Sequence, residues 1–499
     1  MRVVIIGQHP IIKDLVRQYK CRDYKVVHYP DGIFDADELR DMDEVVLLAD
    51  DDNVVLGMMV QVSEKLDMEA RNGRKLTCHL LLHSQAMLQM LHTNDLNEDI
   101  RKKMDVYPFT LNDVWSRNIV LDHEAITIQS EKIAHLVVFG MGDMAEAVAI
   151  NAALVAHYPN YTRNHSLRTR ITIVDENLTS KYHFFIAKYK HLFDNSYYRV
   201  VCPQSAKVVT EFHKPMYSDS REDFVDVEWE FVEASVYDKT LREKLQLWAT
   251  GSRQVLTIAF THTDEECNLA DVQNLPDSVH SVSVPIYVYM RDASIMRLVE
   301  AKGKLANVIP FGMSNCGYDI RMPLVQMAKT VNYIYDAFYN DNFGNYTDKM
   351  LYTVEVDRDK RDMLWQDVTA VKRMSNIYNA MAIPTKMRSV GLQENEWDKF
   401  YDIPQQDIEL LAEVEHNRWT VEELILGWRP CTQDEQQRIE ADISLKADLK
   451  KQRIHYDLRA YGELRPDETG KSVKIYDRCL CAGLPLIAKT YAEEKGGKG

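Results

Sequence analysis

The sequence predicts an α/β protein with two doubly wound parallel-sheet domains followed by a mainly α-helical domain. Three observations lead to this prediction. Short β-branched runs alternate with helical stretches, as in βαβ units. The alternation begins at residues 2–7 and begins again at 135–140, whereas strand patterns stop after about Arg321. We therefore expect three domains, with boundaries at 1–127, 128–320 and 321–499.

The composition excludes several classes of protein. Of the 499 residues, 45% are hydrophobic and 27% are charged, which excludes a disordered or fibrous chain. The net charge of −16 argues against nucleic acid as the main partner. No apolar run is long enough for membrane insertion, and the first residues do not resemble a signal peptide. We expect a cytoplasmic protein whose eight scattered cysteines are free thiols and hold no metal.

The first domain begins with Arg-Val-Val-Ile-Ile-Gly at residues 2–7, a short apolar run that ends in glycine. Such a run is typical of a buried parallel strand that leads into a helix. The pattern then predicts helices over 11–19 and 54–66, and strands over 25–29, 44–49 and 78–82.

The second domain repeats this order of elements. The pattern predicts a helix over 143–157, a loop over 158–169, and strands over 135–140, 170–175, 226–232, 254–260 and 284–290. In both domains an apolar strand runs into an acidic turn, an asparagine and a helix, at 45–53 and at 256–268. This likeness indicates an internal duplication with a linker near 95–130. Chance similarity between two α/β units is the alternative.

The second domain carries a glycine-rich turn between its first strand and its first helix. The turn reads Gly140-Met141-Gly142-Asp143-Met144-Ala145. The first glycine permits a tight turn, the second lets the backbone approach a pyrophosphate, and Ala145 takes the place of a third glycine. A phosphate would sit at the helix N-terminus. A Rossmann-like domain that keeps its glycines only for packing is the alternative.

Asp175 stands at the end of the next predicted strand. An acidic residue there would accept hydrogen bonds from ribose hydroxyls. The first domain has Gly7-Gln8-His9-Pro10 at the equivalent turn, so bulky side chains occupy the place of a phosphate. His9 or Lys13 could bind an anion there, but a degenerate structural copy is the favoured interpretation.

These features resemble the regulator-of-potassium-conductance family, whose N-terminal lobe is also called the TrkA-N domain. Members bind NAD(H), ATP or related adenine nucleotides and gate ion transporters. The resemblance implies phosphate contacts at the Gly140–Ala145 turn, ribose contacts at Asp175, and a far edge of the pocket at Thr261 to Asp264, including His262. The chain departs from the family because no small β-rich lobe follows either copy.

The third domain resembles the bacterial type of ryanodine-receptor (RyR) repeat domain. Its motif is Glu-His-Asn-Arg-Trp at 415–419, followed by Gly-Trp at 427–428 and His-Tyr-Asp-Leu-Arg-Ala-Tyr at 455–461. The resemblance implies a binding or sensing module. The candidate ligand-binding residues are Glu415, His416, Arg418, Trp419, Trp428, His455 and Tyr461. Arg418 is the first candidate, although the same residue types also build the core of a helical domain.

No catalytic constellation is visible in the sequence. The leading hypothesis is a non-enzymatic sensor whose second domain binds NAD(H), ATP, ADP or ADP-ribose and signals to or through the RyR-like domain. Homodimers and an effector protein or membrane transporter are the partners we expect. One alternative is an NAD-dependent oxidoreductase or nucleotide-processing enzyme with His262 as the nearest acid–base candidate. A soluble regulatory subunit of a potassium or other ion transporter is another.

Overall fold

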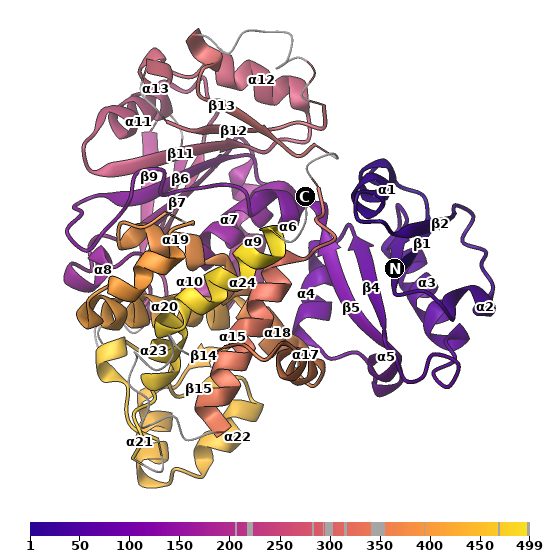
Figure 1. Cartoon of the computed structure of the whole chain (residues 1–499). Coiled ribbons are helices and arrows are strands. Elements are labelled where there is room, and N and C mark those ends of the chain that lie inside the picture. The colour runs from indigo at the N-terminus through magenta and orange to yellow at the C-terminus, as the bar shows by residue number, and fades with distance from the viewer. Residues whose placement is uncertain are drawn as a thin grey trace.

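The computed structural model describes residues 1–204, 207–216, 223–281, 284–292, 294, 303–313, 317–340, 355–393, 395–467 and 470–496. It contains two parallel sheets flanked by helices and a helical C-terminal part, which confirms the predicted α/β fold class (Figure 1). Among the described residues, no helix is both long and apolar enough to cross a membrane.

The first sheet consists of five parallel strands in the order β2-β1-β3-β4-β5. The strands are β1 (Arg2–Gly7), β2 (Lys25–Tyr29), β3 (Glu44–Leu48), β4 (Leu76–Leu82) and β5 (Met104–Thr110). The helices are α1 (Ile12–Lys20), α2 (Ala36–Leu39), α3 (Asp52–Lys65), α4 (Gln85–Thr93) and α5 (Glu98–Lys103). This sheet is doubly wound, with its order reversing between β1 and β3.

The prediction of a linker near 95–130 was wrong for most of that stretch. That stretch contains α5, the edge strand β5 and helix α6 (Leu111–Ser116). Pro108 lies inside β5, so the sequence pattern did not indicate a strand there. Proline is tolerated within a sheet only at an edge, and β5 is an edge strand. Trp115 and Ile126 already belong to the hydrophobic core of the second sheet.

The second sheet has eight strands in the order β13-β12-β11-β6-β7-β10-β8-β9. Its strands are β6 (Ile133–Phe139), β7 (Thr169–Asp175), β8 (Tyr198–Gln204), β9 (Lys207–His213), β10 (Val227–Glu233), β11 (Gln254–Phe260), β12 (Ile286–Tyr289) and β13 (Val308–Phe311). Without the antiparallel β8–β9 hairpin, six parallel strands remain in the 3-2-1-4-5-6 order of a Rossmann fold. The pattern did not predict β8, β9 or β13.

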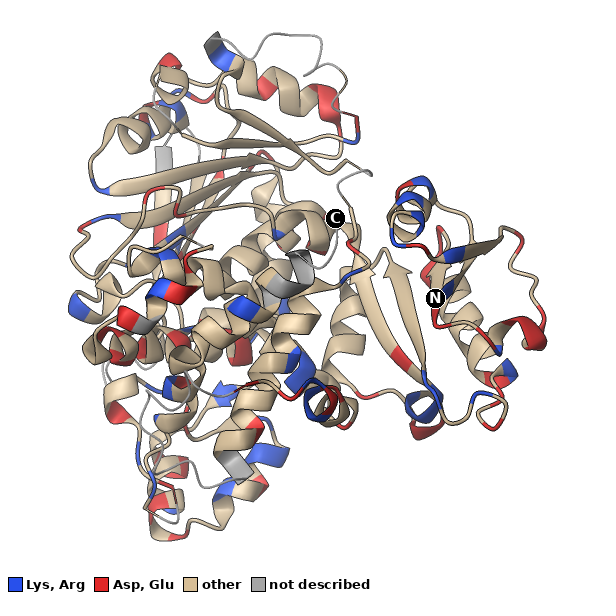
Figure 2. Cartoon of the chain, in the orientation of Figure 1, with Lys and Arg blue, Asp and Glu red and all other residues tan. Residues whose placement is uncertain are grey.

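Helices cover both faces of the second sheet. They are α7 (Asp143–Val155), α8 (Asn160–Arg163), α9 (Tyr182–Lys188), α10 (Lys190–Asp194), α11 (Lys239–Thr250), α12 (Glu265–Gln273) and α13 (Asp277–Ser281). Leu136 and Val138 pack in the core with α7, while Val137 and Phe139 pack in the core with α11. The strands β6, β11, β12 and β13 contain no charged residue, whereas the helices carry both signs (Figure 2), as expected for strands buried on both faces.

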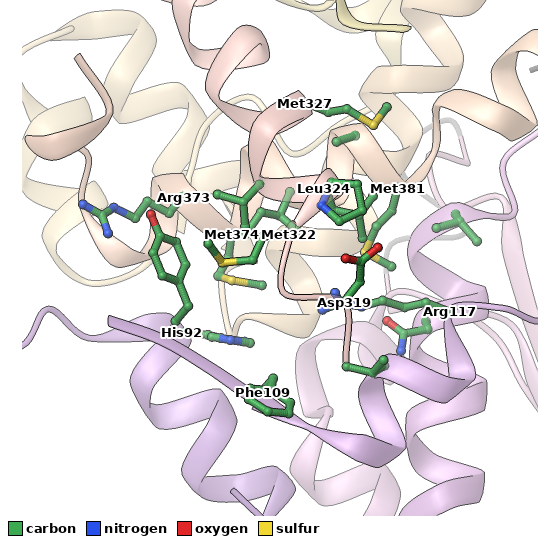
Figure 3. A pocket seen from close by; sticks show the side chains of 18 of the residues that line it. His92, Phe109, Arg117, Asp319, Met322, Leu324, Met327, Arg373, Met374 and Met381 are labelled. Carbon is green, nitrogen blue, oxygen red and sulfur yellow. The ribbon is translucent and has the colours of Figure 1, made fainter. Parts of the chain in front are cut away.

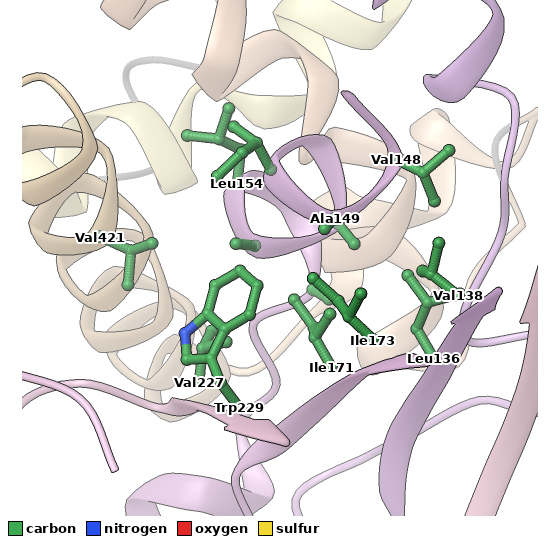
Figure 4. Packing of buried hydrophobic residues seen from close by; sticks show 14 of the residues in the cluster. Leu136, Val138, Val148, Ala149, Leu154, Ile171, Ile173, Val227, Trp229 and Val421 are labelled. Atoms are coloured by element: carbon green, nitrogen blue, oxygen red, sulfur yellow. The ribbon is translucent and has the colours of Figure 1, made fainter. Parts of the chain in front are cut away.

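The helical part packs directly on the second sheet. Its helices are α15 (Pro323–Asn340), α17 (Arg358–Gln366), α18 (Ala370–Met381), α19 (Ile383–Ser389), α20 (Gln405–Ile425), α21 (Gln433–Ala441), α22 (Leu445–Lys451), α23 (Ile475–Ala482) and α24 (Leu484–Gly496), with a short ladder of β14 (Arg429–Pro430) and β15 (Ile454–His455). Val421 of α20 shares one buried cluster with Leu154 of α7 and Trp229 of β10 (Figure 4). The two parts therefore have a common core.

The two acidic turns aligned in the sequence perform the same structural task. Asp51 accepts hydrogen bonds from the backbone of Asn53 and Val54 and caps α3. Asp264 accepts from Glu266 and Cys267 in the same pattern and caps α12. An N-cap carboxylate satisfies helix N–H groups that have no partner within the helix. The equivalent caps agree with an internal duplication.

We predict that Gly7→Ala destabilises the first sheet. Gly7 has φ +98°, and an added Cβ would lie 1.8 Å from the carbonyl oxygen of Leu48. The expected loss exceeds about 2 kcal/mol, because the left-handed backbone and a clash with backbone act together. Urea unfolding with hydrogen exchange of residues 1–110 measures it. Gly57→Ala, in the open on α3, is the control and should gain about 0.5–1 kcal/mol; equal stability of the two variants would contradict the prediction.

Candidate functional site

The candidate site lies where the strand order of the second sheet reverses, between β6 and β11. Ligands of open α/β sheets bind in the crevice at the carboxyl ends of the strands at such a point. Gly140 follows β6 there with φ +100°. A Cβ at Gly140 would lie 3.0 Å from Thr261 Oγ1 and 3.3 Å from His262 Nδ1. Glycine is therefore needed for the backbone of this turn and for the close approach of the loop after β11.

Helix α7 begins in this crevice without a side-chain cap. Gly142 is its N-cap, and a Cβ added there would meet no atom within 4 Å. The backbone N–H groups of the first turn are thus accessible for an anion. Met144 and Ala145 turn their side chains into the core, so these two predicted residues offer only backbone groups to the crevice. Asp143 is exposed in the same turn.

Asp175 ends β7, beside the glycine turn, and is already engaged. Its carboxylate accepts a hydrogen bond from the backbone N–H of Asn177 at 2.8 Å. Lys181 Nζ donates to both carboxylate oxygens of Asp175, at 2.8 and 3.0 Å. The Lys181 side chain is 41% exposed, so a ribose could share or displace it. No sequence pattern indicates Lys181, because it follows the strand by six residues through an irregular turn.

The residues at the predicted far edge of the pocket differ in whether their side chains already make structural hydrogen bonds. Thr261 Oγ1 donates to the carbonyl of Phe139 at 2.7 Å and ties β11 to β6. Asp264 is occupied as the cap of α12. His262 is different, since its Nδ1 faces Gly140 and its Nε2 lies 3.9 Å from Asp271 Oδ2. The structure therefore brings Gly140, Thr261 and His262 together and places the His262 imidazole beside the glycine turn.

The charged residues of the RyR-like motif form a buried ionic network on α20. Arg418 is 1% exposed and donates Nε and Nη2 to Glu415 and Nη1 to Glu422. Lys386 Nζ also donates to Glu415, at 2.5 Å. These cations hold the pKa of Glu415 at about 2 despite its burial. Arg418 thus faces carboxylates of its own helix, which corrects the expectation that it faces a ligand.

The aromatic residues of the same motif surround two histidines. The ring of His416 lies 5.5 Å from Trp419 and 5.7 Å from Tyr461, and its Nε2 contacts the carbonyl of Arg459 at 2.9 Å. His455 packs edge-on to Trp419 and Trp428. Burial lowers the pKa of His455 to about 3, so its imidazole is neutral. A ligand site among these residues stays a prediction.

The structure also brings together two groups of side chains that could ligate a metal and that no sequence pattern indicated. Atoms of His9, Asp50 and His83 lie within 4.8 Å of one another at the carboxyl edge of the first sheet. Both rings already contact backbone: the N–H of Ile11 donates to His9 Nδ1 at 3.3 Å, and His83 Nε2 lies 2.8 Å from the carbonyl of Ala49. A second trio consists of His262, Cys267 and Asp271.

The 3-2-1-4-5-6 strand order and the left-handed glycine at its reversal define the second sheet as a Rossmann-like fold. No family model and no curated protein matches the chain. Solved structures similar to it include D-lactate dehydrogenase from Escherichia coli (10% identity, 64% of this chain, 91% of that chain, TM-score 0.20). Another is an NAD-complexed D-isomer specific 2-hydroxyacid dehydrogenase from Lactobacillus delbrueckii ssp. bulgaricus (9%, 64%, 92%, TM-score 0.20). At these TM-scores the likeness carries no argument about function.

We predict that Glu423→Gln removes a pH dependence of stability. Burial, with the neighbouring Glu422 carboxylate, raises the pKa of Glu423 from 4.5 to about 8. The folded chain holds this proton more tightly than the unfolded chain, so stability should fall as pH rises from 4.5 to about 8. Urea midpoints across that range measure the effect, expected to be at most about 5 kcal/mol. Glu440→Gln, at an exposed position, is the control; a slope that survives in Glu423→Gln would contradict the assignment.

Proposed function

We propose that this chain is a nucleotide-responsive regulatory protein whose second sheet binds an adenine nucleotide, with NAD(H) as the first candidate and ATP, ADP and ADP-ribose as the others. The observation that carries the proposal is the uncapped N-terminus of α7 at the Gly140–Gly142 turn, placed where the strand order reverses. The pyrophosphate would take the N–H groups of that turn, and Asp175 would take the ribose hydroxyls.

The position of α7 supports a regulatory role. The helix begins at the crevice and contacts α20 of the helical part. A nucleotide that favours one position of α7 would thereby favour one arrangement of α20. Regulation of a transporter or effector protein and pairing into homodimers follow only from the family resemblance and stay predictions.

One observation favours a second candidate, an NAD-dependent oxidoreductase. His262 places Nδ1 against the glycine turn and has the Asp271 carboxylate 3.9 Å from Nε2. Histidine is a common general acid–base group, and here a carboxylate lies near its ring at more than hydrogen-bond distance. Such a pair beside a nicotinamide would serve proton transfer during hydride chemistry.

We predict that Gly142→Trp abolishes nucleotide binding without unfolding the chain. The indole would occupy the open space before α7, where a Cβ meets no atom within 4 Å. Isothermal titration with NAD, NADH, ATP, ADP and ADP-ribose should show one preferred nucleotide, with affinity lowered at least about 30-fold in the variant, equal to about 2 kcal/mol. Gly57→Trp, also in the open, is the matched control. No binding by the unmodified chain would overturn the proposal.

We predict that His262→Asn separates the two candidates. Under the regulatory proposal the variant binds the nucleotide within about threefold of the unmodified chain, and the nucleotide still slows hydrogen exchange in α20. Under the oxidoreductase candidate the unmodified chain turns over NAD(H) and the variant loses that turnover. Unchanged exchange in α20 together with turnover lost in His262→Asn would replace the regulatory proposal with the enzyme.

A further inference from the structure

A large cavity lies away from the nucleotide crevice, where the first sheet, α6, α7 and the helical part meet (Figure 3). Its volume is about 700 Å³, within the range of small-molecule sites. Phe109 of β5 and His92 of α4 line one side, Asn151 and Val148 of α7 line a second, and Leu324 of α15 faces them. Helices and strands from parts of the chain far apart in sequence thus build one binding-sized space.

The walls of this cavity are largely apolar and rich in methionine. Figure 3 shows several thioether side chains directed into it from the helical part. The lining methionines are Met104, Met322, Met327, Met374, Met381 and Met387. Unbranched, polarisable methionine side chains adapt to ligands of varied outline. His92 fits this surface, because burial lowers its pKa to about 4 and leaves it uncharged. An apolar body is therefore the part of a ligand that these walls accept.

Two polar atoms of lining residues, Arg117 Nε and Tyr158 Oη, lack a hydrogen-bond partner among the described residues. Arg117 donates Nη2 to Asp113 Oδ2 at 2.5 Å, but its buried Nε has no hydrogen-bond partner in the described part of the chain. A guanidinium has five donors, and a buried donor left unpaired is costly. The Arg117 side chain is 21% exposed and lines the cavity, so a carboxylate or phosphate there would supply acceptors to the exposed part of its guanidinium.

The charged residues along the lining also favour an acidic group on the ligand. Six cationic side chains line the cavity: Lys75, Arg101, Arg117, Arg321, Arg373 and Arg388. Five carboxylates pair with them: Asp95, Asp105, Asp113, Asp122 and Asp319. The excess of positive charge contrasts with a whole chain of net charge −16. The one positive charge in excess favours a ligand with a single acidic group.

We propose that this cavity binds a small amphiphilic organic anion, with its apolar body among the methionines and its acidic group on Arg117. Helix α7 connects this site to the nucleotide crevice. Asn151 of α7 donates to Asp113 Oδ1 at 3.1 Å, and Asp113 holds Arg117. Gly142, at the start of the same helix, lies nine residues earlier, about 14 Å along its axis. The two sites are therefore coupled, a second step that rests on the proposed function, whereas binding in the cavity does not.

The test uses two probes with the same rings on the full-length chain. Anilinonaphthalene sulfonate carries an acidic group, and N-phenyl-1-naphthylamine lacks it. Fluorescence titration should give one site for each probe. Arg117→Gln should weaken the sulfonate at least tenfold and the neutral probe less than threefold, and Arg117→Lys should restore part of the loss. Met381→Trp, which fills the cavity, should remove both sites.

Arg170→Gln is the matched control, because Arg170 is as exposed as Arg117 (21%), pairs with a carboxylate and lies outside the cavity lining. Equal losses in Arg170→Gln and Arg117→Gln would overturn the proposal, as would full binding by a folded Met381→Trp chain, with folding checked by circular dichroism. Saturating NAD should change the affinity for the sulfonate at least about fivefold. No change by NAD would refute the coupling alone, and a Gly142→Trp chain that still binds both probes keeps the cavity independent of the nucleotide site.

Discussion

The packing of α7 between the second sheet and the helical part is the constraint on which the other features depend. Ten of its thirteen residues are buried, and many of them are alanines, which let the sheet on one side and α20 on the other approach closely. The glycine turn, the attachment of α20 through Val421 and one wall of the methionine-lined cavity all take their positions from this helix. A helix that is mostly buried moves only if its neighbours repack, which is the physical basis of the coupling proposed between its two ends.

A buried ionic network explains why the motif at 415–428 contains charged residues. Its members are Lys386, Glu415, Arg418 and Glu422. Glu415, Arg418 and Glu422 recur at spacings of three and four residues, so their side chains meet on one face of α20. Taking these charges out of water is costly, and the cost is offset only because every cation has a carboxylate partner. The network therefore fixes which face of α20 turns inward. Trp419 of α20 and Trp428, which follows that helix, then pack against His455 of β15.

Much of the fold was predictable from local pattern. Strands buried on both faces read as apolar runs, and the carboxylates Asp51 and Asp264 mark the helix starts that follow two of them. The prediction failed for β5, where Pro108 interrupts the run, and for the hairpin of β8 and β9, whose outer position needs no continuous apolar sequence. Of the candidate site, the glycine turn and Asp175 were identified correctly in position, but Lys181 and Asp271 were not. Their relevance depends on distances between segments that the chain order does not encode.

The sequence by itself determined the α/β class, the glycine turn and the acidic helix starts, because turn geometry and capping are satisfied by residues only a few positions apart. The tertiary structure alone decided that Arg418 is an internal counter-ion, since its burial depends on α19 and α20 coming together. Only the tertiary structure shows that His262 lies near both Gly140 and Asp271. It also shows that three parts of the chain line one cavity, in whose wall Arg117 Nε has no hydrogen-bond partner among the described residues. Packing between distant segments sets burial and charge environment, and these quantities determine what a side chain can do.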